Sequence, residues 1–279
     1  MIWKIRSREL DLTRRAVVMG IINATPDSFS DGGQFLDHEA ACAHGLALVE
    51  GGAEILDIGG ESTRPGSEGV SAEEETHRVL PVIEALRRAT DVIISIDTSK
   101  ASVARAALEA GADIINDVTG LRGDPQMTAL AAEFRAGVVI MHMQGSPLTM
   151  QSAPSYGDVV AEVGEFFRHS LEGAVASGLD PMSIAFDPGI GFGKSPAHNL
   201  ALLAGIESFV PLGRPILLGV SRKSILGHLA KSSAMEDRLW PGVALTVLCR
   251  ERGARIFRVH EAKPHHLALR AAETLLGDD

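Results

Sequence analysis

Residues 19–34 read MGIINATPDSFSDGGQ, and the change of character inside this stretch indicates the fold. An apolar run from Val17 to Ile22 gives way at Asn23 to a segment rich in Thr, Pro, Asp, Ser and Gly. A buried parallel strand that runs into a long polar loop has this pattern. Because α/β proteins place their binding sites where the strands end, this loop is the first candidate for chemistry.

Apolar runs and helical patterns alternate along the chain. Runs of strand length cover residues 16–22, 54–58, 92–96, 113–116, 138–141, 183–186, 216–220 and 255–259. Helical spacing is clearest over residues 39–51, 72–88, 100–110, 158–177 and 262–276. Eight strands at about 30 residues per unit predict an α/β protein of the (β/α)₈ TIM-barrel type, although alternation alone leaves a doubly wound open sheet as the competitor. We expect one domain over residues 1–279, with residues 1–14 as a short N-terminal extension.

The composition is that of an ordinary globular enzyme. Of the 279 residues 45% are apolar, and the net charge of −10 argues against nucleic acid or an anionic membrane as a partner. No apolar run has the length of a signal peptide or a membrane span, so we expect a cytoplasmic protein. Cys42 and Cys249 lie in apolar helical patterns and are expected to be small buried thiols.

A polar side chain stands at the end of every predicted strand. In a barrel the carboxyl ends of the strands converge on one face, so these side chains are expected to line one site. They are Asn23, Asp57, Asp97, Asn116, Asp117, His142, Asp187, Ser221, Arg222, Lys223, Arg258 and His260. For His142 two roles stay open: it could pack in the core or support the site, or it could take part in catalysis. His265 and His266, on the last helix, are expected at the surface.

Three of these strand ends together suit a flat heterocycle. Asp97, Asn116 and Asp187 offer two carboxylates and an amide. A carboxylate can accept two parallel hydrogen bonds from the ring N–H and the exocyclic amine of an amino-pyrimidinone. The alternative for Asp97 is that it only caps the helix that follows.

Other strand ends suit an anion. Ser221 and Lys223 lie in GVSRKSILG (219–227), where backbone N–H groups at the start of a helix favour a negative charge. Arg258 and His260 alternate on one strand and therefore share a face. Together with Asn23 they suit a polyphosphate and a divalent ion, and Mg²⁺ in such a site would keep several waters and take few protein ligands.

Two loops complete the expected site. The segment DPGIGFGKS (187–195) fails the spacing of both a phosphate-binding P-loop and a dinucleotide-binding GxGxxG loop, so we interpret it as a glycine platform that presents Phe192 to a flat ligand. The segment GGESTRPGSEGVSAEEE (59–75) places Thr63, Arg64 and Pro65 at the rim and ends in a capping signal at Ser71.

Eight stretches in the same order resemble those of the bacterial dihydropteroate synthases. They are MGIINATPDSFSDGG, DIGGESTRPGSEGVSAEEE, ISIDTSK, AGADIINDVTGL, VIMHMQGSP, FDPGIGFGKS, LLGVSRKS and RVHE. The resemblance covers residues 15–276. It implies a transferase of folate biosynthesis that joins 7,8-dihydropterin-6-ylmethyl diphosphate to p-aminobenzoate and releases pyrophosphate.

The resemblance also implies a role for individual residues. The pterin would be bound by Asp97, Asn116, Met141, Asp187 and Lys223. The diphosphate would be bound by Asn23, Arg64, Arg258 and His260, with Asn23 also on Mg²⁺. The p-aminobenzoate would be bound by Phe29, Thr63, Arg64, Pro65, Phe192 and Ser221. The implied catalytic groups, which stabilise an SN1-like pterin cation and its leaving pyrophosphate, are Asp97, Asp187, Lys223, Arg258 and His260.

Further implications are a homodimer, inhibition by sulfonamides, and lids over residues 25–33 and 63–66. Two alternatives remain: an enzyme like the methyltetrahydrofolate-corrinoid methyltransferases, and a non-catalytic pterin-binding paralogue. Against the first alternative, such a methyltransferase would not need the loops and anion sites described above. Against the second, such a paralogue would be expected to have lost Asp97, Lys223 or Arg258. The departures from the family pattern are Glu261 and Trp240-Pro241.

Overall fold

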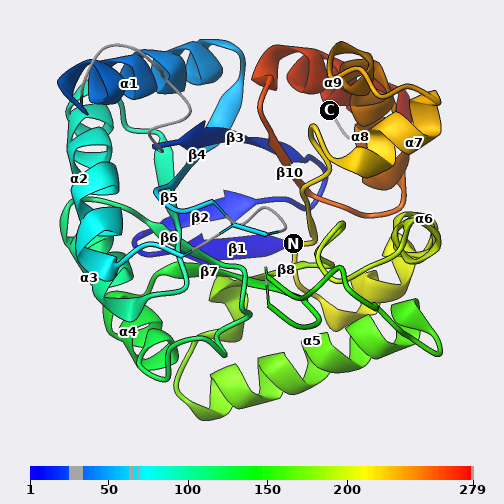
Figure 1. Ribbon diagram of the computed structural model, residues 1–279, viewed down its shortest axis with the longest axis horizontal. Coiled ribbons are helices and arrows are strands. Elements are labelled where there is room, and N and C mark those ends of the chain that lie inside the picture. Colours follow the sequence, from blue (N-terminus) through cyan, green and yellow to red (C-terminus); the bar gives the residue numbers. More distant parts are fainter. Residues whose placement is uncertain (25–33, 63–65, 68, 147, 278–279) are drawn as a thin grey trace.

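Eight parallel strands form a barrel in the computed structural model, which describes residues 1–24, 34–62, 66–67, 69–146 and 148–277 (Figure 1). The hydrogen-bonded order is β8-β7-β6-β5-β4-β3-β10-β9. A parallel bridge between Phe186 and Ile216 joins the two ends of this order, so the sheet closes. The strands are β3 (Val17–Asn23), β4 (Ala53–Gly59), β5 (Ile93–Asp97), β6 (Ile114–Asp117), β7 (Gly137–Met141), β8 (Ile184–Asp187), β9 (Leu217–Leu218) and β10 (Ile256–Val259). The predicted TIM barrel is confirmed, and the open-sheet alternative is excluded.

Helices surround the barrel (Figure 1). They are α1 (Gln34–Glu50), α2 (Ala72–Ala89), α3 (Ala101–Glu109), α4 (Met127–Phe134), α5 (Val159–Ala176), α6 (Pro196–Ala204), α7 (Ser224–Ala230), α8 (Leu239–Glu251) and α9 (Ala262–Leu276). Helix α2 begins as expected, because the Ser71 side chain accepts a hydrogen bond from the Glu74 N–H. Within the described ranges no helix is both long enough and apolar enough to cross a membrane.

The N-terminal residues close the end of the barrel at which the strands begin, called the floor below. Strands β1 (Ile2–Ile5) and β2 (Arg8–Asp11) pair as an antiparallel hairpin. Trp3 and Ile5 are completely buried, in one cluster with barrel side chains such as Met19. The indole N–H of Trp3 donates to the Ser183 carbonyl at 2.7 Å. Residues expected as a mere extension therefore form the floor of the barrel.

Polar side chains occupy the opposite end of the barrel interior. Asp57, Asp97, Asn116 and Asp187 are all buried at the carboxyl ends of their strands, above the apolar side chains of the lower layers. A TIM barrel carries its chemistry at this end.

The structure tests the burial expected for the two cysteines and the surface position expected for His265. Cys249 is buried as expected, and Cys42 is half-buried. The surface prediction for His265 is wrong, because His265 is 1% exposed and its Nδ1 lies 2.8 Å from the Thr246 hydroxyl. His265 belongs to the buried stripe of α9 that includes Ala262 and Leu269.

Candidate active site

An ion-pair cluster joins four strands at the carboxyl end of the barrel. Arg258 on β10 donates from Nε to Asp57 Oδ2 at 2.5 Å and from Nη2 to Asp97 Oδ2 at 2.7 Å. Asp57 Oδ2 also accepts from Asn116 Nδ2 at 3.0 Å. Asp57 is completely buried, so its carboxylate holds Arg258 and Asn116 in place without contact to solvent. Sequence reasoning noted Asp57 as a strand end but gave it no role.

Two carboxylate oxygens of this cluster retain acceptor capacity. Asp57 Oδ1 and Asp97 Oδ1 are buried and have no hydrogen-bond partner among the residues that the structure describes. Burial raises the pKa of Asp97 to about 7, against the lowering effect of the Arg258 guanidinium. Buried acceptors left unpaired cost free energy, so a ligand that donates N–H groups here would relieve that cost. The idea that Asp97 only caps a helix is wrong, because α3 has Lys100 at its N-cap, the first N–H group of α3 donates to Asp124, and Asp97 bonds Arg258 instead.

Asp187 and Lys223 face the same space from the other side of the barrel. A Cβ placed on Gly219 would lie 3.8 Å from Arg258 Cβ and 3.9 Å from Asp187 Oδ2, so both side chains flank the end of β9. Burial raises the pKa of Asp187, and the nearby Lys223 opposes this. Burial lowers the pKa of Lys223 to about 8, and Asp187 opposes that in turn. The carboxylate and the ammonium therefore support each other's charged form.

The Lys223 side chain rests on the glycine-rich loop after β8. Its Nζ donates to the Ile190 carbonyl at 2.6 Å and lies 4.5 Å from the centre of the Phe192 ring. Phe192 in turn packs against the buried cluster that contains Met141. The loop thus brings together Met141, Phe192 and Lys223, three residues that the resemblance assigned to the two substrates.

Ser221 and His260 form a second polar pair at the strand ends. The Ser221 hydroxyl lies 2.9 Å from His260 Nδ1 and accepts from the His260 backbone N–H at 3.2 Å. Arg222, which lies between Ser221 and Lys223 in the chain, has a φ of 61° and forms an ion pair with Glu261. Glu261, although it departs from the family pattern, therefore links the end of β10 to the loop that carries Ser221. Asn23 ends β3 half-buried, beside Gly59.

Several predicted residues lie outside the described part of the chain. They are Phe29, Thr63, Arg64 and Pro65, together with the lid expected over residues 25–33 and all of the lid expected over residues 63–66 except Gly66. Their assignments to p-aminobenzoate and diphosphate stay predictions.

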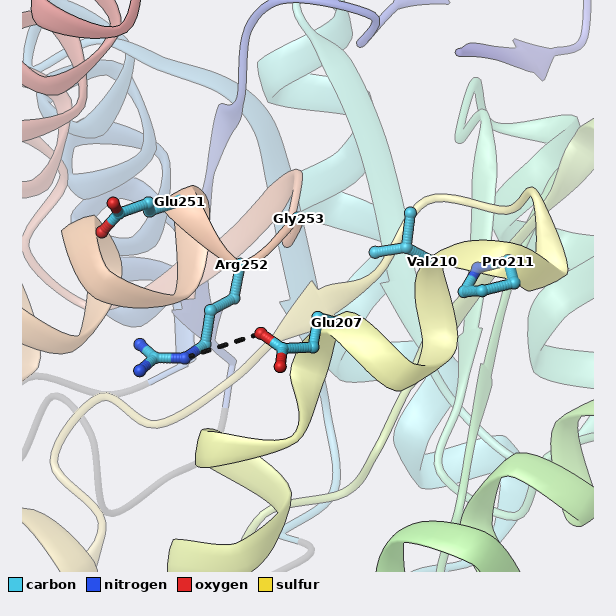
Figure 2. Close-up of a pocket in the computed structure, with 6 residues that line it drawn as sticks. All are labelled: Glu207, Val210, Pro211, Glu251, Arg252 and Gly253. Atoms are coloured by element: carbon cyan, nitrogen blue, oxygen red, sulfur yellow. Dashed lines mark ion pairs between the residues drawn. The ribbon is translucent and has the colours of Figure 1, made fainter.

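A separate hollow of about 650 Å³ is lined by other residues. Figure 2 shows the side chains that line it. It is formed by the 3₁₀ helix η3 (Ile206–Leu212) and the end of α8, which lead into β9 and β10 at the floor end of the barrel. Across it, Arg252 Nε and Glu207 Oε2 face each other at 4.0 Å. The residues that line the hollow are Glu207, Val210, Pro211, Glu251, Arg252 and Gly253. None of them is a predicted site residue.

Comparison with known proteins agrees with this geometry. The family model described as "Pterin binding enzyme" matches residues 19–260. A dihydropteroate synthase of Synechocystis is 43% identical over 95% of this chain and 92% of the relative. The Escherichia coli K12 dihydropteroate synthase is 45% identical over 93% of this chain and 91% of the relative.

A solved structure gives the same result in three dimensions. The Xanthomonas albilineans dihydropteroate synthase with 4-aminobenzoic acid has a TM-score of 0.92 and 46% identity, covering 99% of this chain and 98% of that one. Similarity of this extent, in sequence and in fold, means that the chain belongs to the pterin binding enzyme family and, within it, to the dihydropteroate synthases.

Proposed function

We propose that this chain condenses 7,8-dihydropterin-6-ylmethyl diphosphate with p-aminobenzoate to give 7,8-dihydropteroate and pyrophosphate. The observation that carries this proposal is the cluster of half-buried Arg258 with the buried Asp57, Asp97 and Asn116, in which carboxylate oxygens are left for a ligand. Names of solved relatives add support, since one holds 4-aminobenzoic acid and another holds 7,8-dihydropteroate.

The pterin is proposed to bind across the barrel mouth. Asp97 and Asn116 approach from one side, and Asp187 and Lys223 from the other. Carboxylates and an amide are suited to the alternating N–H donors and acceptors on the edge of an amino-pyrimidinone ring. Met141 is buried at the end of β7, where an apolar side chain can pack against the flat ring.

The diphosphate is proposed to bind at Arg258, His260, Asn23 and Arg64. Because a guanidinium carries more N–H donors than its two carboxylate bonds use, Arg258 can also serve a phosphate oxygen. The described residues include no group of three His, Cys, Asp or Glu side chains arranged around a metal ion. Asn23 offers one amide oxygen, which fits Mg²⁺ that takes its other ligands from phosphate and water. When bound, Mg²⁺ would offset the negative charge of the leaving group.

In the proposed reaction the carbon–oxygen bond to the diphosphate breaks and pyrophosphate leaves with the bonding electrons. The positive charge that develops on the pterinylmethyl group is stabilised by Asp97 and Asp187, while Arg258 and His260 neutralise the pyrophosphate. The arylamine nitrogen then forms the new bond to carbon and releases one proton. Fixed charges of this kind are each worth on the order of 3 kcal/mol of transition-state stabilisation, or ~10²-fold in rate.

The p-aminobenzoate is proposed to lie on Phe192, beside Ser221 and the residues Phe29, Thr63 and Pro65. The half-buried Phe192 offers an aromatic face, and the start of α7 offers backbone N–H groups for the carboxylate. A sulfonamide occupying the same place should compete with p-aminobenzoate, and a Yersinia pestis dihydropteroate synthase has been solved with a sulfonamide drug.

The test is a turnover assay with Mg²⁺ and both substrates, in which each component is omitted in turn. Formation of dihydropteroate and pyrophosphate only in the complete mixture is expected. Tight binding of the pterin diphosphate without turnover would refute the proposal and would favour the non-catalytic paralogue. Methyl transfer from methyltetrahydrofolate to a corrinoid protein would instead favour the methyltransferase alternative, for which no relative named above gives support.

A homodimer through the late helices is a further part of the proposal. Apolar side chains are exposed at Leu229 on α7, at Met235 and at Trp240 and Leu248 on α8, with Trp240 at 69% exposure. Light scattering should give twice the mass of the chain, and Trp240→Glu should lower it. A cytoplasmic location stays a prediction.

A further inference from the structure

The glycine-rich loop after β8 runs directly against the end of β7. Gly189 and Gly193 have φ values of 65° and 62°, in the region that disfavours side chains. A Cβ on Gly189 would collide with the His142 carbonyl, and one on Gly193 with the Gln144 carbonyl. The loop can lie this close to the neighbouring strand end only because both positions are glycine. Close approach alone does not hold it there.

Lys194 supplies a bond between the two segments. Its side chain is 3% exposed, and its Nζ lies 3.0 Å from His142 Nδ1, 3.2 Å from the His142 carbonyl and 3.0 Å from the Phe192 carbonyl. One buried amine therefore ties Phe192 to the end of β7. Buried lysines are uncommon unless their charge or hydrogen bonds are fully used, so this placement calls for a reason.

The loop is tied at further points by other elements. The Tyr156 hydroxyl donates to the Gly193 carbonyl at 2.8 Å, and Gln151 Nε2 donates to the Gly191 carbonyl at 2.6 Å. The Gly191 N–H donates to Asn199 Oδ1 at 2.8 Å. Among these ties Lys194 is the one that bonds the Phe192 backbone itself. The ring of that residue and the neighbouring Ile190 carbonyl are the two groups against which Lys223 rests.

We infer that Lys194 is a positioning residue for p-aminobenzoate, acting through the backbone of Phe192. This inference rests on the proposed function, in which Phe192 forms one face of the p-aminobenzoate site. In this role Lys194 does not contact either substrate. It fixes the position and orientation of Phe192, against which p-aminobenzoate lies.

The Lys194–His142 pair can keep its hydrogen bonds in either protonation state. Burial lowers the pKa of Lys194 to about 7, with Asp187 raising it and Lys223 lowering it. Burial lowers the pKa of His142 to about 3, so its ring is neutral. An ammonium donates to both carbonyls and to His142 Nδ1. A neutral amine donates to the same carbonyls and accepts from Nδ1–H of the other tautomer. A positioning role is therefore independent of pH near neutrality, whereas a proton-transfer role is not.

The test compares Lys194→Met with the unmodified enzyme in steady-state turnover from pH 6 to pH 8.5. Methionine keeps the apolar length of the side chain and removes the donors. The KM for p-aminobenzoate should rise about tenfold, which corresponds to about 1.4 kcal/mol, the weight of one ordinary hydrogen bond, while the KM for the pterin diphosphate stays within twofold. The ratio of the two enzymes' KM values for p-aminobenzoate should not change with pH.

Arg250→Met is the matched control for loss of stability alone. Arg250 is 2% exposed and pairs with Glu273 on α9, so its removal also leaves a buried group without its partner. It should lower the melting temperature and leave both KM values unchanged. Lys194→Gln, which keeps an amide donor, should give a smaller rise than Lys194→Met and tests the inference should the methionine variant not fold.

Three results would overturn the inference: unchanged KM values in both Lys194 variants, equal rises for the two substrates, or a loss of kcat that follows a pKa near 7. An unmodified enzyme that forms no dihydropteroate would instead contradict the proposed function.

Discussion

Replacing Asp97 by Asn should change how the stability of this protein depends on pH. Asp97 has a pKa of about 7 in the native state, against an ordinary value of 3.8, because burial disfavours its charged form and Asp57 repels it. Between these two pH values the native protein holds a proton that the unfolded chain has released. Stability from this group is therefore complete below pH 3.8 and is lost as the pH rises through 7.

The size of the effect follows from the two pKa values. Each pKa unit corresponds to about 1.4 kcal/mol, so the interval from 3.8 to about 7 amounts to roughly 4 kcal/mol of unfolding free energy. The amide side chain of the Asp97→Asn variant does not titrate. The unfolding free energy of this variant, relative to the unmodified protein, should therefore increase by roughly 4 kcal/mol between pH 4 and pH 8. Pterin binding should weaken in the same variant, since the carboxylate is lost.

Urea unfolding at half-unit steps of pH measures this difference directly. Ser95→Ala is the matched control, because Ser95 is also buried, lies beside Asp57 in the strand register and does not titrate. Its stability relative to the unmodified protein should be constant across the range. A constant difference for Asp97→Asn, or one that decreases with rising pH, would refute the reasoning.

Three further predictions concern neighbouring parts of the structure. Asp57→Asn should lower the pKa of Asp97 below about 7, because a repelling charge is removed. Carbon-13 NMR of the Asp97 carboxyl group measures this pKa, and a rise in the pKa would contradict the role given to Asp57. Gly189→Ala should lower the free energy of unfolding in urea by at least about 2 kcal/mol, because the backbone there is left-handed and the new Cβ would collide with the His142 carbonyl. Gly173→Ala, in a helix with open space around it, should instead raise the free energy of unfolding by about 0.5–1 kcal/mol. Trp3→Ala should cost about 3–5 kcal/mol through the cavity left in the barrel floor, and a cost below about 1 kcal/mol would mean that the hairpin is dispensable.

Much of the fold followed from periodicity, and the misses have physical causes. The eight barrel strands are buried on both faces and therefore appear as apolar runs, which made them predictable. The hairpin over Ile2–Ile5 and Arg8–Asp11 was missed because four-residue strands carry too little alternation to stand out. Helices α4 and α7, of eight and seven residues, are too short for a clear helical stripe.

The candidate site was predictable where position on a strand decided it. Asp97, Asn116, Asp187 and Arg258 were found because the ends of parallel strands meet at one face. His265 was misplaced because two adjacent histidines were taken for surface residues, although a spacing of four to Leu269 places it on the buried face of α9. That spacing was visible in the sequence.

Patterns along the chain were enough to predict the class of fold, the end of the barrel that carries the chemistry, and the family. These follow from local patterns and from motif order, which are properties of the chain read along its length. By contrast, the pairing of Arg258 with Asp57 and Asp97 and the burial of Lys194 against His142 are visible only in the folded chain. Such pairs join residues that lie 201, 161 and 52 positions apart. Their contacts, burial and pKa values arise only when the closed sheet removes water and sets the distances between the strands.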